Sequence, residues 1–190
     1  MTADHRSAIA RRFAAELPPR IAKRPRDARG FPISFVTAIG EDGTPDFTEL
    51  DGPRRAQAII EHLCGLCGFE LPLIRAVIGG PQVVEQHLAM DPPMCVECSF
   101  FAATHAAAGC PFLLMPAARF RKDRATRPSS PLVAKERPQV MYLARTFAHD
   151  AVHLELPDGS AEVMALCARW TSVEEIRAGE LIDTRHLTRP

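Results

Sequence analysis

Two Cys-x-x-Cys pairs constrain the fold of this chain more than any other feature of its sequence. The first pair, Cys64 and Cys67, lies in HLCGLCGFEL, and the second, Cys95 and Cys98, lies in DPPMCVECSF. Four thiolates form a complete ligand set for a tetrahedral zinc ion. The sequence therefore predicts one structural zinc ion that is bound by all four cysteines.

The local sequence gives each pair a reason to hold its sulfurs together. Gly65 and Gly68 allow a tight turn in the first pair, and Gly68 can adopt the positive φ that closes a knuckle. The second pair is predicted to lie in the first turns of a helix, where residues i and i+3 share one face and the helix N-terminus stabilises thiolates. A knuckle, a β segment and a helix that donates two ligands follow one another in a treble-clef zinc site, so we expect a treble-clef-like unit.

The other cysteines and the nearest histidine do not fit the same metal site. Along a continuous helix Cys110 would lie about 18 Å beyond Cys98, and His105 about 10 Å beyond it, at a rise of 1.5 Å per residue. This separation disfavours an iron–sulfur cluster that includes Cys110, and haem ligation by Cys110 is disfavoured as well. We expect Cys110 and Cys167 to be buried small side chains. Two unrelated pairs of buried thiols are the alternative to the zinc site.

The composition is that of an ordinary globular protein. The chain has 190 residues, of which 46% are apolar and 24% are charged, and this is enough for one domain with its own core. No apolar run reaches the roughly 18 residues that a membrane span requires, and the arginines near the N-terminus are not followed by an apolar stretch. We therefore expect a cytoplasmic protein without a membrane contact, whose cysteines do not form disulfides.

Hydrophobic periodicity and turn signals predict both helices and strands. Helices are predicted over residues 4–17, 52–63, 92–108 and 171–182. The third would be capped by Asp91, and the fourth by Ser172 with Glu175. Strands are predicted over 31–39, 46–50, 73–80 and 139–147, and within 151–170 on both sides of a Pro157-Asp158-Gly159 turn. The sequence thus predicts an α+β fold, with a treble-clef-like zinc unit embedded in a single small domain of β-hairpins and short helices.

Charge is distributed unevenly, although the net charge is zero. The first 30 residues carry eight Lys or Arg against three acidic residues, and residues 119–137 carry seven against two. We predict four segments: a basic helical arm and linker (1–29), a hairpin plus zinc-binding core (30–115), a basic Pro-rich linker (116–138), and a C-terminal β-hairpin and helix that pack on the core (139–190). Nucleic acid could bind the basic flanks, but these have few aromatic residues for base stacking, so it is not the favoured partner.

Two histidines allow a second interpretation of the function. His149 and His153 are predicted to lie on one face of a strand. We expect them to face solvent, but such a pair could also serve acid–base or metal chemistry. The alternative to a binding protein is therefore a small-molecule enzyme whose site lies between the zinc unit and the C-terminal sheet, using His105, Cys110, His149 or His153. The sequence contains no serine-hydrolase, metalloprotease, deaminase or phosphate-loop motif.

Several of these motifs occur together in one known group of proteins. RGFPISFVTAIGEDGTPDF, LCGLCG and DPPMCVECSFFAATHAAAGCPFL resemble uncharacterised bacterial and phage-encoded proteins that have an FPVP-type strand, a C-x-x-C-G knuckle, a Pro-Pro-x-His/Cys-x-x-Cys element and an Ala-Cys-Pro-Phe-Leu ending. The resemblance spans roughly residues 30–115. It implies zinc bound by Cys64, Cys67, Cys95 and Cys98 and implies no reaction, so we expect a binding or scaffolding module with an unknown protein or small-molecule partner.

Overall fold

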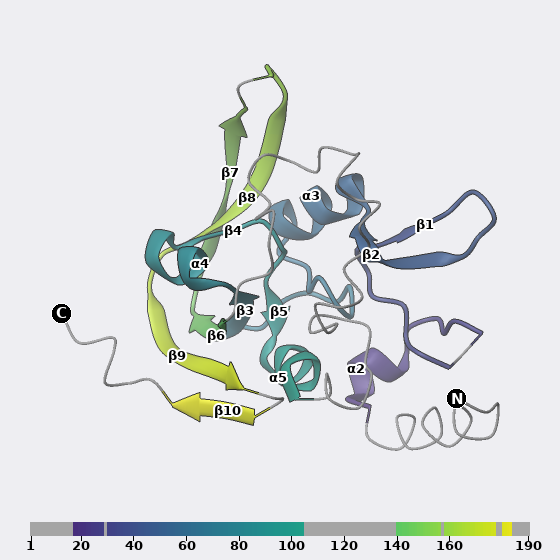
Figure 1. The fold of residues 1–190 in the computed structure, drawn as a ribbon, viewed down its shortest axis with the longest axis horizontal. Helices are drawn as coiled ribbons and strands as arrows, with labels where there is room; N and C mark the ends of the chain where they lie inside the picture. The colour runs from purple at the N-terminus through teal and green to yellow at the C-terminus, as the bar shows by residue number, and fades with distance from the viewer. Residues whose placement is uncertain (1–16, 29, 105–139, 157, 178–179, 184–190) are drawn as a thin grey trace.

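The computed structural model shows a mixed α+β fold (Figure 1). It describes residues 17–28, 30–104, 140–156, 158–177 and 180–183. The helices among them are α2 (Pro19–Ala22), α3 (Gly52–Ile60), α4 (Pro81–Gln86) and α5 (Val96–Thr104). The predicted helix over 4–17 and the predicted linker over 116–138 lie outside the described residues, so the division into four segments stays a prediction.

The described strands form three antiparallel sheets. The first is a hairpin of β1 (Thr37–Ile39) and β2 (Pro45–Leu50). The second has the order β10-β9-β6-β3-β5, made of β3 (Arg75–Gly79), β5 (Met94–Cys95), β6 (Met141–Thr146), β9 (Trp170–Arg177) and β10 (Glu180–Asp183). The third has the order β4-β8-β7, made of β4 (Leu88–Ala89), β7 (His149–Glu155) and β8 (Ala161–Cys167). The β1–β2 and β7–β8 hairpins project from the body of the molecule in different directions (Figure 1).

The first predicted hairpin is confirmed, although its first strand is shorter than expected. Gly43 has a φ of +79°, and the Asp42 carboxylate accepts a hydrogen bond from the Thr44 amide at 2.9 Å, which stabilises the turn. Residues before Thr37 do not continue the strand because they bind the knuckle instead. The Phe35 amide donates to the carbonyl of Leu66 at 3.0 Å. The start of the hairpin is thereby attached to the first cysteine pair.

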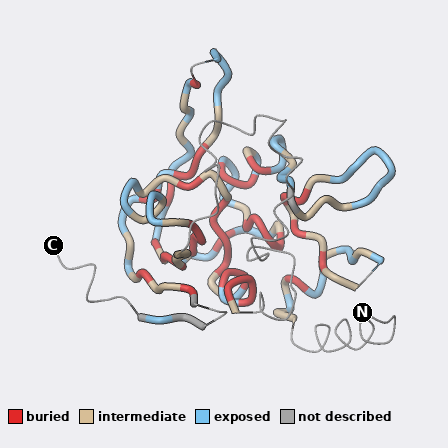
Figure 2. The backbone as a smooth tube through the Cα atoms, in the orientation of Figure 1, coloured by how far each residue is buried: buried red, intermediate tan, exposed pale blue. Residues whose placement is uncertain are grey.

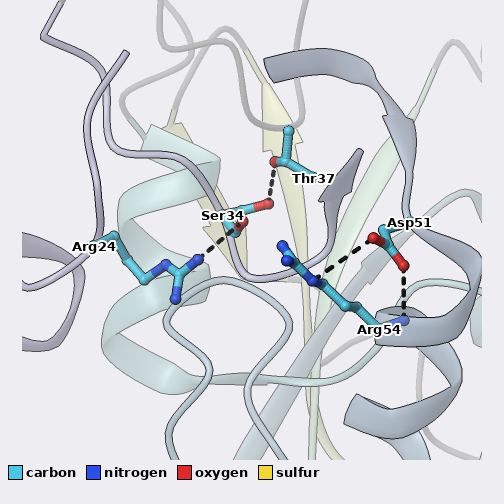
Figure 3. A network of polar contacts seen from close by, with 5 residues as sticks. All are labelled: Arg24, Ser34, Thr37, Asp51 and Arg54. Carbon is cyan, nitrogen blue, oxygen red and sulfur yellow. Dashed lines mark hydrogen bonds and ion pairs between the residues drawn. The ribbon is translucent and has the colours of Figure 1, made fainter. Parts of the chain in front are cut away.

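Helix α3 begins at the position that the sequence predicts and ends three residues early. The Asp51 carboxylate caps it by accepting a hydrogen bond from the Arg54 amide at 2.9 Å, as Figure 3 shows. The helix ends at Ile60, and His62 then adopts a left-handed conformation with a φ of 54°. This turn directs the chain away from the helix axis and into the knuckle.

The helix predicted over 92–108 begins later than expected. Pro92 and Pro93 are buried and extended, and Met94 and Cys95 pair with β3 as strand β5. Helix α5 starts at Val96, so Asp91 does not cap it. The carbonyl of Pro93 instead accepts a hydrogen bond from the Gly65 amide at 3.1 Å. The extended segment thus joins the two cysteine pairs before the helix begins.

The helix predicted over 171–182 is wrong. Residues 170–177 and 180–183 form β9 and β10, which pair with each other, and β9 also pairs with β6 along its length. Ser172, predicted to cap a helix, accepts a hydrogen bond from Arg145 on β6 at 3.0 Å. Pairing with the neighbouring strands therefore outweighs the local capping signal in this segment.

Figure 2 shows that buried stretches of chain lie in the middle of the molecule, and the larger core includes the four cysteines. It combines residues of α2, β3, α5, β6 and β9 with the knuckle, including Ile21, Leu66, Phe101, Leu143 and Ile176. A second, smaller cluster lies around Ile59, Val77 and Ala165. Among the described helices, none has both the length and the apolar character that crossing a membrane requires.

Candidate metal centre

The structure brings the four cysteines of the two pairs together. The sulfur atoms of Cys64, Cys67, Cys95 and Cys98 all lie within 4.8 Å of one another, and all four residues are buried. The sulfurs of Cys67 and Cys95 are 3.8 Å apart. Zinc–sulfur bonds of about 2.3 Å in a tetrahedron place the ligands about 3.8 Å from each other. The cluster could therefore hold a metal ion, and no other such group of His, Cys, Asp or Glu is found among the described residues.

The first pair lies in a tight knuckle whose geometry depends on Gly68. This residue has a φ of +76°, as its glycine predicts, and its amide donates to the carbonyl of Cys64 at 2.8 Å. The amide of Cys64 donates in turn to the carbonyl of Phe69 at 2.8 Å. A Cβ atom at Gly68 would lie 2.8 Å from Cδ2 of Phe35. Both the backbone conformation and the space therefore favour glycine at this position.

The second pair spans the junction between β5 and α5. Cys95 is the last residue of β5 and faces Arg75 on β3, whereas Cys98 lies in the first turn of the helix. Backbone amides approach one of the sulfurs: those of Cys95 and Cys67 donate to Sγ of Cys64 at 3.3 Å and 3.5 Å. Such contacts stabilise thiolate over thiol.

The sulfurs strongly perturb one another because they are buried together. Burial raises the pKa of the Cys64 thiol, and a hydrogen bond from Cys64 lowers the pKa of Cys67. Four buried thiolates would repel one another without a cation between them. The cluster is thus suited to a bound cation, which lets all four sulfurs remain deprotonated.

A cationic side chain that the sequence did not single out also contacts the cluster. Nη1 of Arg20 in α2 donates to Sγ of Cys95 at 3.3 Å and to the carbonyl of Glu70 at 3.0 Å. The hydrogen bond to Cys95 raises the pKa of Arg20. Arg20 is one of several basic residues in a Pro-rich segment, and nothing in its sequence context distinguishes it from its neighbours.

The structure also places the remaining candidate residues. Cys167 is buried in β8, as predicted, and burial raises its pKa to about 12. His153 is exposed, as predicted. His149 was predicted to face solvent, and this is wrong because only 2% of its surface is exposed. Cys110 and His105 lie outside the described residues.

His149 belongs to a second cluster of polar side chains. Its Nε2–H donates to the carbonyl of Ile59 at 3.1 Å, which leaves Nδ1 to accept from Nη1 of Arg75 at 3.2 Å. The same Nη1 lies 3.3 Å from Nδ1 of His62, and the two imidazole rings meet edge to face at 4.6 Å. Burial lowers the pKa of His149 to about 4, so the ring is neutral at pH 7. No motif in the sequence indicates that His62 and Arg75 lie beside this histidine.

A cavity of about 590 Å³ lies elsewhere, near the β1–β2 turn. It is lined by Arg26, Asp27, Ala28, Ile33, Asp42, Gly43, Thr44 and Pro45. Neither His149 nor His153 contributes to its walls. This cavity therefore does not correspond to the enzyme site that the sequence suggested.

Comparison with known proteins does not place the chain in a family. No family model, curated protein or solved structure matches it. The metal centre is therefore interpreted from its own geometry and chemistry.

Proposed function

We propose that this chain is a zinc-binding protein with a structural, treble-clef-like four-cysteine centre, and that it acts as a binding or scaffolding module. The observation that carries the proposal is the convergence of four buried sulfurs within 4.8 Å of one another. Four thiolates favour zinc over the harder divalent cations, which prefer oxygen ligands. Because all four positions are protein ligands, the centre leaves no open site for a substrate and suits a structural role.

The order of elements supports the treble-clef-like description. A knuckle (64–68) precedes β3, and α5 follows with Cys98 in its first turn. The resemblance to the bacterial and phage-encoded group rests on the same motifs and is part of this proposal. Within it, zinc holds the knuckle against the start of α5, in the middle of the main core.

Exposed apolar side chains in the chain segment that follows the first cysteine pair support a protein partner. Phe69 directly follows the knuckle and is 41% exposed, and Leu73 is 72% exposed. Ile74 lies next to it and is 43% exposed. Large apolar side chains close together on a surface are more typical of contact sites than of surfaces that only face water.

The contacts of the basic segment argue against nucleic acid as its partner. Figure 3 shows Arg24 directed at Ser34, and its guanidinium donates to the carbonyls of Ile33 and Ser34 at 2.9 Å and 3.4 Å. Arg20 is likewise engaged with Cys95 and a backbone carbonyl. These donors are used inside the protein, so fewer remain for phosphate groups.

The enzyme alternative receives little support from His149. Both of its ring nitrogens have protein partners, and the side chain is almost fully buried. A general acid or base must reach the proton of a bound substrate. This geometry fits a histidine that connects α3 with β7 better than one that acts on a small molecule.

Elemental analysis of the purified full chain tests the proposal. We expect one zinc ion per chain, with X-ray absorption reporting four sulfur ligands at about 2.3 Å. Cys67→Ser and Cys98→Ser should lose the metal, whereas the matched variant Cys167→Ser should keep it. Iron in place of zinc, a metal-free wild type, or equal loss in the Cys167 variant would each contradict the assignment.

A further inference from the structure

Arg20 links both cysteine pairs through a single guanidinium group. It donates to the sulfur of Cys95, which belongs to the second pair. It also donates to the carbonyl of Glu70 and lies 5.9 Å from the ring centroid of Phe69, both of which follow the first pair directly. Arg20 therefore has three contacts, two with the residues that follow the knuckle and one with a ligand sulfur.

The position of Arg20 is fixed by the packing of α2. The next residue, Ile21, is fully buried and belongs to the same core cluster as the four cysteines. The amide of Ala22 donates to the carbonyl of Pro18 at 2.9 Å, which closes this single helical turn. In Figure 1, α2 lies at the start of the described chain. Because Ile21 is buried in the core, the backbone that carries the Arg20 side chain is anchored.

The negative charge of the proposed centre explains how the hydrogen bond from Arg20 to Cys95 would stabilise it. One zinc ion with four thiolates carries a net charge of −2, and burial makes that charge costly unless hydrogen-bond donors spread it. The amides that approach Cys64 supply two such donors, which are neutral. Among the described residues, Arg20 is the one Lys or Arg that hydrogen-bonds a cysteine sulfur. The hydrogen bond from Arg20 to Cys95 is therefore charge-assisted, unlike the two from backbone amides to Cys64.

Such a bond changes what a metal-bound thiolate can do. A thiolate that attacks an alkylating agent forms a carbon–sulfur bond and expels the leaving group as an anion, and the neutral thioether that results is a poor zinc ligand. A cation on the sulfur lowers the electron density available for this attack. The same guanidinium also holds the Cys95 sulfur in place from outside, because it is itself bound to the carbonyl of Glu70, and this opposes movement of the sulfur away from the metal.

We propose that Arg20 controls the reactivity of the metal centre, protecting the Cys95 thiolate from electrophiles and slowing the release of the metal. This inference rests on the proposed zinc site and adds a specific role for the N-terminal segment. Composition alone would suggest that Arg20 belongs to a solvated basic flank, whereas this inference makes Arg20 itself part of the metal centre.

Paired arginine variants test the inference. Arg20→Met removes the donor and keeps a long apolar side chain. Arg24→Met is the matched control, because Arg24 lies in the same segment and contacts the Phe35 ring at 5.8 Å and backbone carbonyls, but no sulfur. The two measurements are the rate of zinc transfer to a chromophoric chelator and the site of iodoacetamide alkylation by mass spectrometry. For Arg20→Met we expect transfer about 10-fold faster than wild type and alkylation that begins at Cys95.

Further outcomes separate this role from a general loss of stability. Arg20→Lys keeps the charge and should restore part of the protection. In the cobalt-substituted protein, the sulfur-to-cobalt charge-transfer band should shift in Arg20→Met and Arg20→Lys but not in Arg24→Met. Unchanged transfer and an unchanged band in the Arg20 variants, or equal changes in the Arg20 and Arg24 variants, would overturn the inference while leaving the zinc site intact. A wild type that binds no metal would instead refute the proposed function, and the inference with it.

Discussion

The buried His149 should make the protein sensitive to acid within a defined range of pH. Burial lowers the pKa of His149 to about 4 in the folded protein, whereas an unfolded chain restores the ordinary value of 6.5. Between these two values the unfolded chain binds more protons than the folded one. The contribution of neutral His149 to the free energy of unfolding is therefore fully present above pH 6.5, and it is lost as the pH falls toward 4.

The groups around the ring explain the direction of the shift. Desolvation is the largest cause, and the neighbouring His62 and Arg75 add positive charge that opposes protonation. The hydrogen bond to the carbonyl of Ile59 and the negative charge of Asp150 act in the opposite sense. A full shift from 6.5 to about 4 corresponds to about 3 kcal/mol, of which about 2 kcal/mol is lost between pH 7 and pH 5.

Urea unfolding of wild type and His149→Gln at pH 7 and pH 5 measures this effect. Glutamine can keep a hydrogen bond to the carbonyl of Ile59 but does not titrate. Cysteine ligands also take up protons in acid, but they do so in both proteins, so the difference between the two slopes isolates His149. We expect wild type to lose about 2 kcal/mol more than the variant. Parallel losses in the two proteins would refute the assignment of a neutral, buried imidazole.

Three further comparisons of variants test the metal centre, the knuckle and the cap of α3, each by thermal unfolding. Cys67→Ser or Cys98→Ser should cost far more stability than Cys167→Ser, because losing a ligand opens the coordination shell; similar melting temperatures would contradict this division. Gly68→Ala should cost on the order of 2 kcal/mol more than Gly43→Ala, since both have positive φ but only the first would place a Cβ against another side chain; equal costs would remove the role assigned to that contact. Asp51→Ala should cost about 1 kcal/mol through the lost cap of α3, and Asp51→Asn much less.

The four-cysteine cluster was predictable because the geometry within each pair is local. The spacing of three residues keeps the two sulfurs of each pair close together, and Gly68 indicates the turn that closes the knuckle. What the sequence did not specify is how the second pair is presented. Met94 and Cys95 pair with β3, and this pairing delays the start of α5 to Val96. A capping residue and prolines show that a helix can start at a position, but they do not show that it does. Here the pairing of β5 with β3 determines that α5 begins later.

The C-terminal region shows the same competition more strongly. Ser172 and Glu175 form a plausible capping pair in isolation, yet both lie in β9, opposite Arg145 and Tyr142 of β6. Strand pairing satisfies the backbone of each residue through partners that are distant in the chain. A window of single-sequence periodicity contains no information about such partners, so a capping signal alone could not exclude the strand.

Long-range side-chain contacts are the part that sequence reasoning missed altogether. Arg20 meets Cys95 across 75 positions of the chain, and Arg75 meets His149 across 74. Neither arginine belongs to a sequence motif. The contacts of each depend on how the fold places residues that are distant in the chain. Composition assigned Arg20 to a basic flank, and the structure instead places its charge on a buried sulfur.

The stretch from His62 to Cys64 connects the two polar clusters of the molecule. His62 follows the end of α3 and has a positive φ, and its ring lies beside Arg75 and His149. Two residues later the chain reaches Cys64, whose sulfur is held by the amides of the knuckle and of Cys95. The carbonyl of His62 also accepts from the amide of Leu71 at 2.8 Å, which closes the base of the knuckle. A positive φ at a residue other than glycine costs free energy, and at His62 it occurs in the turn that lies between the histidine cluster and the four-cysteine cluster.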